Sequence, residues 1–109
     1  MDFILSSNFN ETKNLWEVFI TGEIDIYNSI KFKESLCNLI DNKPTDIHIY
    51  CEKLEYIDST GLGSLVAILK KVRQYNGNIH LFNLTASVSK LFKITDLNKV
   101  FIIEGDANE

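Results

Sequence analysis

The sequence predicts an α/β fold, a small, mixed and mostly parallel β-sheet with three or more helices packed on it. Short segments rich in β-branched and aromatic residues alternate with segments whose apolar residues recur at helical spacing. The expected order is β-β-α-β-α-β-α-β, and a strand, a helix and a following strand normally form a right-handed crossover into a parallel sheet. With 109 residues, 45% of them hydrophobic, the chain has the size and composition of a single domain, residues 1–109.

The first half contains two strands, a helix and a third strand. Strands are expected at residues 3–6 and 15–21, joined by a polar turn at 8–14. A helix capped by Asn28 or Ser29 follows and ends before Pro44, because the residue preceding proline avoids helical geometry. Its apolar face is predicted to comprise Ile30, Phe32, Leu36, Leu39 and Ile40. Residues 46–51 alternate apolar and polar side chains and predict a strand.

The second half repeats the helix–strand pattern. An apolar stripe predicts a helix over residues 61–75, ended by Asn76 and Gly77; it comprises Leu62, Leu65, Val66, Leu69 and Val72. Residues 79–83 predict a strand, and Thr85 or Ser87 caps a shorter helix that turns Val88, Leu91 and Phe92 inward. A last strand is expected at 100–103, and the tail at 104–109 is expected to fray.

Composition argues against several classes of protein. A net charge of −4 disfavours nucleic-acid binding. The longest uncharged stretch near the middle, residues 61–69, is far too short for a membrane span. Cys37 and Cys51 form neither a metal spacing nor a redox pair, and each is expected to be a small buried apolar residue. We therefore expect a soluble, cytoplasmic monomer with no metal and no cofactor.

The segment Asp58-Ser59-Thr60-Gly61-Leu62-Gly63 carries most of the functional information, since it leads from the strand-like Tyr56-Ile57 into an amphipathic helix. In one interpretation, Ser59, Thr60 or Asp58 caps the helix and nothing more. Three capping side chains in a row, however, exceed what one helix needs. In the other interpretation, Ser59 is phosphorylated: the helix N-terminus tolerates the phosphate, but a partner covering the hydroxyl would have to desolvate a dianion.

Other chemistry at this segment is disfavoured. Gly61-x-Gly63-x-x-Val66 lacks the third small residue of a dinucleotide fingerprint, and the chain has no P-loop. No Gly-x-Ser-x-Gly surrounds Ser59, so a nucleophile elbow is absent. His48 and His80 lie within strand patterns and are expected to be strand-face residues rather than catalytic bases.

Three motifs at matching spacing resemble the STAS domain of bacterial anti-sigma factor antagonists. They are the opening Gly22-Glu23-Ile24-Asp25-Ile26-Tyr27, the loop Tyr56-Ile57-Asp58-Ser59-Thr60-Gly61-Leu62-Gly63, and Leu91-Phe92-Lys93-Ile94-Thr95-Asp96-Leu97. With the element order, the resemblance covers about residues 3–103. The loop is most similar to that of the general stress-response antagonists, and the sporulation antagonists are near relatives. The family often has proline near Ile30, where it only pre-sets backbone geometry.

The resemblance implies a non-enzymatic partner switch. Unphosphorylated, such a protein binds an anti-sigma factor that is also a serine kinase, which frees a sigma factor for transcription; a PP2C-type phosphatase reverses the phosphorylation. It places the phosphoacceptor at Ser59, with Thr60 as the alternative. Partner contacts are expected along two segments: Asp25, Tyr27, Asp58, Ser59, Thr60, Gly61, Leu62 and Gly63. Within them, Thr60, Gly61 and Gly63 are expected to shape the turn. Tyr27 and Leu62, if exposed beside the loop, would be apolar anchors for the partner, and Leu62 is alternatively a core residue. A scaffold or sensing module of a stress-signalling assembly, or a small nucleotide-binding domain, remains the alternative.

Overall fold

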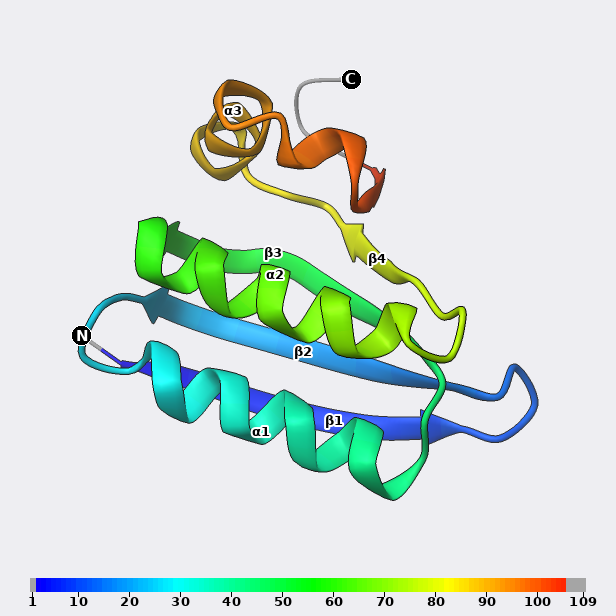
Figure 1. Ribbon diagram of the computed structural model, residues 1–109. Helices are drawn as coiled ribbons and strands as arrows, with labels where there is room; N and C mark the ends of the chain where they lie inside the picture. Colours follow the sequence, from blue (N-terminus) through cyan, green and yellow to red (C-terminus); the bar gives the residue numbers. More distant parts are fainter. Residues whose placement is uncertain (1, 106–109) are drawn as a thin grey trace.

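The computed structural model describes residues 2–105 (Figure 1). Its element order is the expected β-β-α-β-α-β-α-β with one added 3₁₀ turn at Leu97–Lys99. The elements are β1 (Phe3–Asn10), β2 (Leu15–Ile24), α1 (Ser29–Asn42), β3 (Asp46–Ile57), α2 (Ser59–Arg73), β4 (Ile79–Phe82), α3 (Ala86–Ile94) and β5 (Ile102–Glu104).

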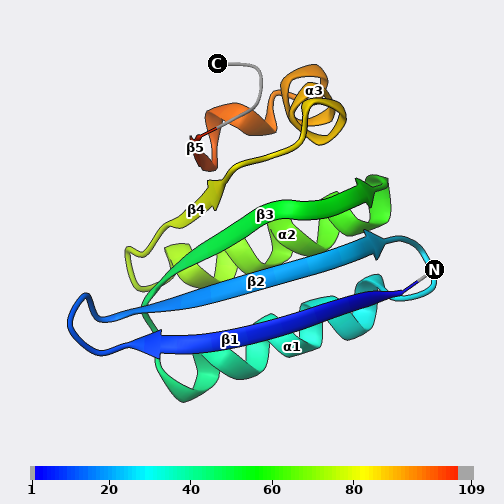
Figure 2. The same ribbon diagram turned by 180° about the vertical axis from the view of Figure 1, so that it is seen from behind.

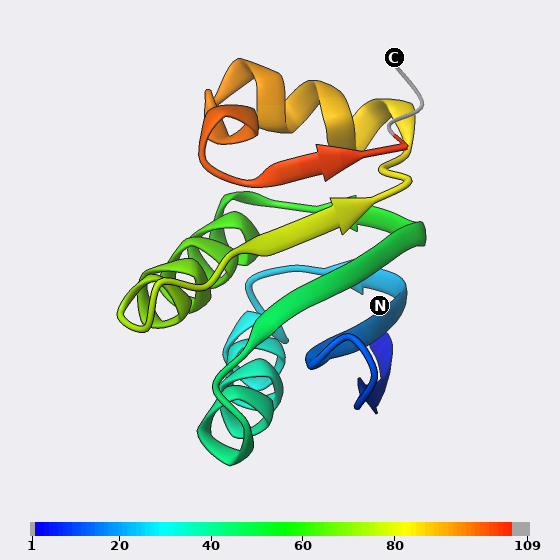
Figure 3. The same ribbon diagram turned by 90° about the vertical axis from the view of Figure 1, so that its right-hand side faces the viewer.

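The strands form one five-stranded sheet in the order β1-β2-β3-β4-β5. β1 and β2 form an antiparallel hairpin, and every later neighbour is parallel, as crossovers through helices require. Helices α1 and α2 lie side by side on one face, whereas the view from behind and the edge-on view show the opposite face without a helix over it (Figures 2 and 3). The predicted mixed, mostly parallel sheet with helices is thus confirmed.

Element boundaries differ from expectation mainly where the chain continues beyond its obvious pattern. β3 extends from Asp46 to Ile57 because register shifts opposite β2 let it change its alternation and continue. β5 begins at Ile102, later than expected, because Leu97–Lys99 first forms a 3₁₀ turn. Glu104, expected in a frayed tail, is the last residue of β5. Residues 106–109 of that tail lie outside the described residues.

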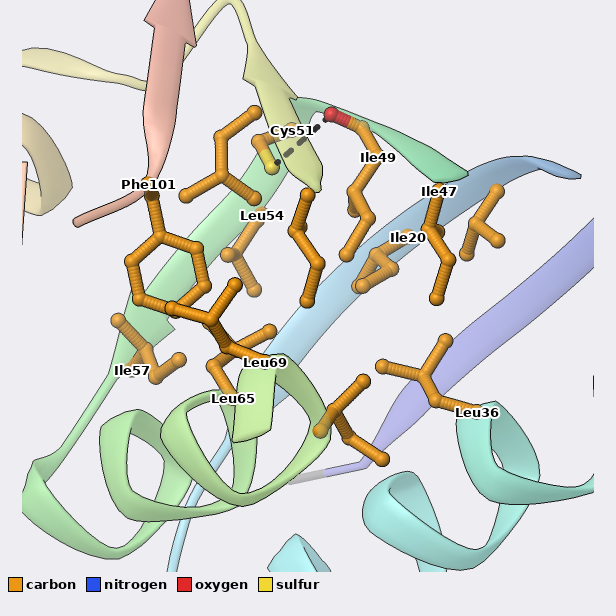
Figure 4. Packing of buried hydrophobic residues seen from close by; sticks show 14 of the residues in the cluster. Ile20, Leu36, Ile47, Ile49, Cys51, Leu54, Ile57, Leu65, Leu69 and Phe101 are labelled. Carbon is orange, nitrogen blue, oxygen red and sulfur yellow. Dashed lines mark hydrogen bonds between the residues drawn. The ribbon is translucent and has the colours of Figure 1, made fainter. Parts of the chain in front are cut away.

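The core fills the space between the sheet and the helices α1 and α2. Figure 4 shows Leu36 from α1 and Leu65 and Leu69 from α2 pointing at strand residues that include Ile20 and Ile49. Removing such apolar surface from water is the main force that holds the layers together. None of the helices in the described residues is long and apolar enough to cross a membrane.

Cys51 lies in the core as predicted, and Ile30 does not. Cys51 is buried, and desolvation raises the pKa of its thiol to about 12, so it behaves as a small apolar residue; Cys37 is half-buried. Ile30, predicted to face the core, is 70% exposed. The buried stripe of α1 runs at four-residue intervals through Phe32, Leu36 and Ile40, and Ile30, two residues from Phe32, points away from it.

Candidate functional site

The loops that carry the first two family motifs lie next to each other at one edge of the sheet. β2 and β3 are parallel neighbours with Ile24 opposite Ile57, so their carboxyl ends meet there. The Asp58 N–H donates to the Ile24 carbonyl at 3.2 Å, which joins the residue after β3 to the end of β2. Ser59 and Asp25, far apart in sequence, therefore belong to adjoining loops.

Asp58 is the residue that organises this junction. Its Oδ1 accepts hydrogen bonds from the backbone N–H of Thr60 and of Gly61, both at 3.0 Å, and from the Thr60 hydroxyl at 2.6 Å. The hydrogen bond from the Thr60 hydroxyl is the largest influence on the pKa of Asp58; burial opposes it, but together with the N–H groups of Gly61 and Thr60 this hydrogen bond holds the pKa below its usual value. The carboxylate thus caps α2, and the Asp58 backbone joins the start of this helix to the end of β2.

Ser59 and Thr60 differ in what their hydroxyls do. Ser59 is the first residue of α2 and is exposed, and within the described part of the chain its side chain has no hydrogen-bond partner. Thr60 is half-buried, and its hydroxyl is engaged by Asp58. Of the three caps that the sequence offered, Asp58 is the one that caps α2, and Ser59 and Thr60 do not. The Ser59 side chain therefore has no structural role in the described residues.

The next two residues face inward. Leu62 is only 5% exposed and belongs to the core. A Cβ on Gly61 would lie 2.6 Å from Ile57 and 2.9 Å from Ile24, both buried side chains, so glycine is required for α2 to approach the sheet. The expectation that Gly61 and Leu62 contact a partner is not supported by their positions, because both are covered by the protein itself.

Gly63 presents the opposite case. It is exposed, its φ is not positive, and a Cβ placed on it would meet no atom within 4 Å. The expectation that Gly63 shapes the turn is therefore wrong. It lies four residues after Ser59, on the same face of α2. A glycine inside a helix costs about 1 kcal/mol relative to alanine, and nothing in the free protein explains that cost.

The β2–α1 turn is held by its own side chains. Asp25 Oδ1 accepts from the N–H groups of Tyr27 at 2.9 Å and of Asn28 at 3.2 Å. The side chain of the buried Asn28 bonds back to the same turn. Its Oδ1 accepts from the Asp25 N–H, and its Nδ2 donates to the Glu23 carbonyl, both at 2.9 Å. Asn28 is the N-cap residue of α1, one of the two positions predicted, but its side chain makes no cap hydrogen bond to the helix and fixes the turn instead.

Large apolar side chains are exposed around these two loops. Tyr27 is 93% exposed, which meets the condition on which it was proposed as a partner anchor. Ile26, Ile30 and Tyr56 are 63%, 70% and 49% exposed. We call these four residues the apolar patch. The exposure of Ile26 and Ile30 was not predicted, because an isoleucine near a strand end or a helix start cannot be told from a core residue until the backbone direction is known. Tyr56 was predicted only as part of the loop motif.

The two histidines are strand residues and lie outside this junction. His48 and His80 lie on neighbouring strands β3 and β4, with ring centroids 4.5 Å apart, and the strand-face prediction is confirmed. Within residues 2–105 no group of three or more His, Cys, Asp or Glu side chains is arranged to hold a metal ion. What the geometry provides is one free hydroxyl on a rigid, partly apolar surface.

This fold and this loop define a regulatory STAS domain, and comparison with known proteins agrees. The STAS domain family matches residues 7–109, and the chain belongs to that family. The anti-sigma-B factor antagonist of Bacillus subtilis (strain 168) is 33% identical over 99 residues, 91% of this chain and 90% of that protein.

Solved structures agree on the fold. An anti-sigma factor antagonist described from Thermotoga maritima superposes with a TM-score of 0.84 at 22% identity, covering 92% of this chain and 85% of that one. The Bacillus antagonist SpoIIAA gives 0.76 at 21% identity in its unphosphorylated form, covering 94% and 87%, and 0.68 at 20% in its phosphorylated form, covering 94% and 90%.

Proposed function

We propose that this protein is an anti-sigma factor antagonist controlled by phosphorylation of Ser59. The observation that carries the proposal is the exposed Ser59 hydroxyl, which has no hydrogen-bond partner in the described residues and stands on a helix end already capped by Asp58. The curated relative is named an anti-sigma-B factor antagonist, and SpoIIAA is known in unphosphorylated and phosphorylated forms.

Transfer to Ser59 needs no rearrangement of the fold. The Ser59 Oγ attacks the γ-phosphorus of ATP held by the kinase, the bond to ADP breaks, and the hydroxyl proton passes to a base of the kinase. The product carries about −1.5 to −2 charges beside Asp58. Because Asp58 already caps α2, the stability of the helix does not depend on the Ser59 hydroxyl. Its replacement by a phosphate should therefore leave the fold unchanged.

Phosphorylation of Ser59 would change the binding of the partner. An anti-sigma factor that is itself a serine kinase would cover Ser59, the exposed Gly63 and the apolar patch in one surface. Tyr27 and its neighbours supply the apolar anchors, and the missing side chain at Gly63 admits close approach. After phosphorylation the same surface would bury a dianion next to a carboxylate, which costs several kcal/mol without a pairing cation. A PP2C-type phosphatase would restore binding.

The test is labelling by the cognate serine kinase in ATP, with the site located by mass spectrometry. Ser59→Ala should abolish the label. Ser87→Ala is the matched control, because Ser87 is also an exposed serine in the first turn of a helix. Wild-type labelling of Ser59→Ala, or phosphate found on Thr60, would refute the assignment. Binding of the anti-sigma factor should weaken roughly 100-fold on phosphorylation, as the desolvation cost implies.

A further inference from the structure

The face of the sheet opposite α1 and α2 carries a row of stacked aromatic rings. Phe19, Tyr50 and Phe82 are register partners across β2, β3 and β4. Their ring centroids are 4.9 Å apart at each step, with interplanar angles of 12° and 19°. That separation equals the spacing between strands, so the rings stack directly across the sheet. We call these three residues the aromatic ladder.

The β1 end of the aromatic ladder is open. Opposite Phe19 on β1 stands Ser6, whose side chain is too small to cover the ring, and Phe19 is 43% exposed. An aromatic face open to solvent on a rigid sheet attracts a flat cation, and a guanidinium is the group that stacks best there. The free ring face therefore favours an arginine side chain.

Carboxylates surround the aromatic ladder. Glu17 stands two residues before Phe19 on β2 and Glu52 two residues after Tyr50 on β3, so each shares the face of its ring, and Glu104 on β5 is the register partner of Phe82. After burial, the charges of these three carboxylates raise the pKa of Tyr50. Glu17 and Glu52 accept hydrogen bonds from asparagine amides, and within residues 2–105 neither forms an ion pair with a lysine or arginine. Glu104 contacts His80 at 3.2 Å. Two carboxylates beside the rings are thus available to an incoming cation.

We propose that this open face of the sheet binds an arginine-containing basic segment of a protein partner. One guanidinium stacks on the free face of Phe19 and pairs with Glu17, and the next cation along the segment pairs with Glu52. The negative charge of the face selects against nucleic acid and against a second copy of the chain, which would present the same carboxylates. The site is separate from Ser59, since Tyr50 lies seven residues before Ile57 on β3, roughly 20 Å away at strand spacing.

The experiment measures fluorescence anisotropy of a labelled alternating arginine–serine octapeptide at pH 7.5. Ser6→Leu fills the space over Phe19 and should weaken binding at least about fivefold. Ser7→Leu is its control, because Ser7 is also exposed on β1 but points to the other face. The pair Glu17→Gln with Glu52→Gln should show a similar loss. The pair Glu11→Gln with Glu34→Gln removes the same charge elsewhere and should leave binding unchanged, as should Ser59→Ala.

Several outcomes would overturn the proposal. Equal loss in both glutamate pairs would mean attraction to net charge alone. Unchanged binding in Ser6→Leu would exclude Phe19 as the contact. Tighter binding of an oligothymidylate octamer would make the face a nucleic-acid surface. A dimer in gel filtration that Ser6→Leu disrupts would make the occupant a second copy. None of these results bears on Ser59, so failure here is distinguishable from failure of the proposed switch.

Discussion

The inner and outer sides of the first turns of α2 differ in whether contacts within the protein explain their residues. On the inner side, Gly61, Leu62 and Ser64 are buried, and each is explained by what it touches. Ser64, for example, donates its hydroxyl to the Ser29 carbonyl and so joins α2 to the start of α1. On the outer side, Ser59 and Gly63 touch nothing that explains them. Residues that the fold requires stand one or two positions from residues that the fold leaves unexplained, so adjacency within a motif does not imply a shared role.

The largest effect is expected on the inner side. Gly61→Val places new carbons within the space already filled by Ile57 and Ile24, and we expect a loss of about 3 kcal/mol in the free energy of unfolding. Urea denaturation measures it. Gly63→Val is the control, because the same side chain there meets open space. Equal losses of unfolding free energy for the two variants would contradict the distinction between the inner and outer sides of α2.

Asp58 joins the two sides, and its removal should rank second. Asp58→Ala deletes the cap of α2, so we expect a loss of about 1–2 kcal/mol at pH 7. The pKa of Asp58 is lowered in the folded state, so its contribution is complete above the unfolded value and disappears as pH falls through the folded value. Wild type should therefore lose more stability between pH 7 and pH 2 than Asp58→Ala does. Glu34→Ala, an exposed carboxylate elsewhere, should behave as wild type.

A gain in stability is the third expectation, and it tests the outer side. Gly63→Ala should raise the free energy of unfolding by about 1 kcal/mol, because alanine is the better helix former and its Cβ meets no neighbour. The same variant should weaken binding of the anti-sigma factor. Ala67→Gly, one turn further along α2, is the reverse control: it should cost stability and leave the affinity nearly unchanged. A stabilised Gly63→Ala that still binds fully would show that the partner does not use this gap.

The inner side could be predicted from the sequence and the outer side only in part. Helical spacing identified Leu62, Leu65 and Leu69 because burial imposes a period that the sequence records. Capping rules offered Asp58, Ser59 and Thr60 as caps of α2 but could not choose among them, because the choice depends on where the helix begins after the strand. They placed Asn28 at the start of α1, where it lies, but they did not predict its side-chain bonds to Asp25 and Glu23. The aromatic ladder was missed for a related reason: register between strands is a tertiary property.

Ser59→Asp should have the smallest effect on stability and a large effect on binding of the anti-sigma factor. This contrast separates the outer side of α2 from the inner side most clearly. Ser59 is exposed and has no hydrogen bond in the described residues, so the free energy of unfolding should change by about 0.5 kcal/mol or less. The added carboxylate beside Asp58 should weaken binding of the anti-sigma factor, as measured by isothermal titration calorimetry. Ser87→Asp, at the corresponding turn of α3, should leave that binding unchanged. A large loss of stability in Ser59→Asp would mean that the hydroxyl supports the fold, and the outer side would then follow the same rule as the inner one.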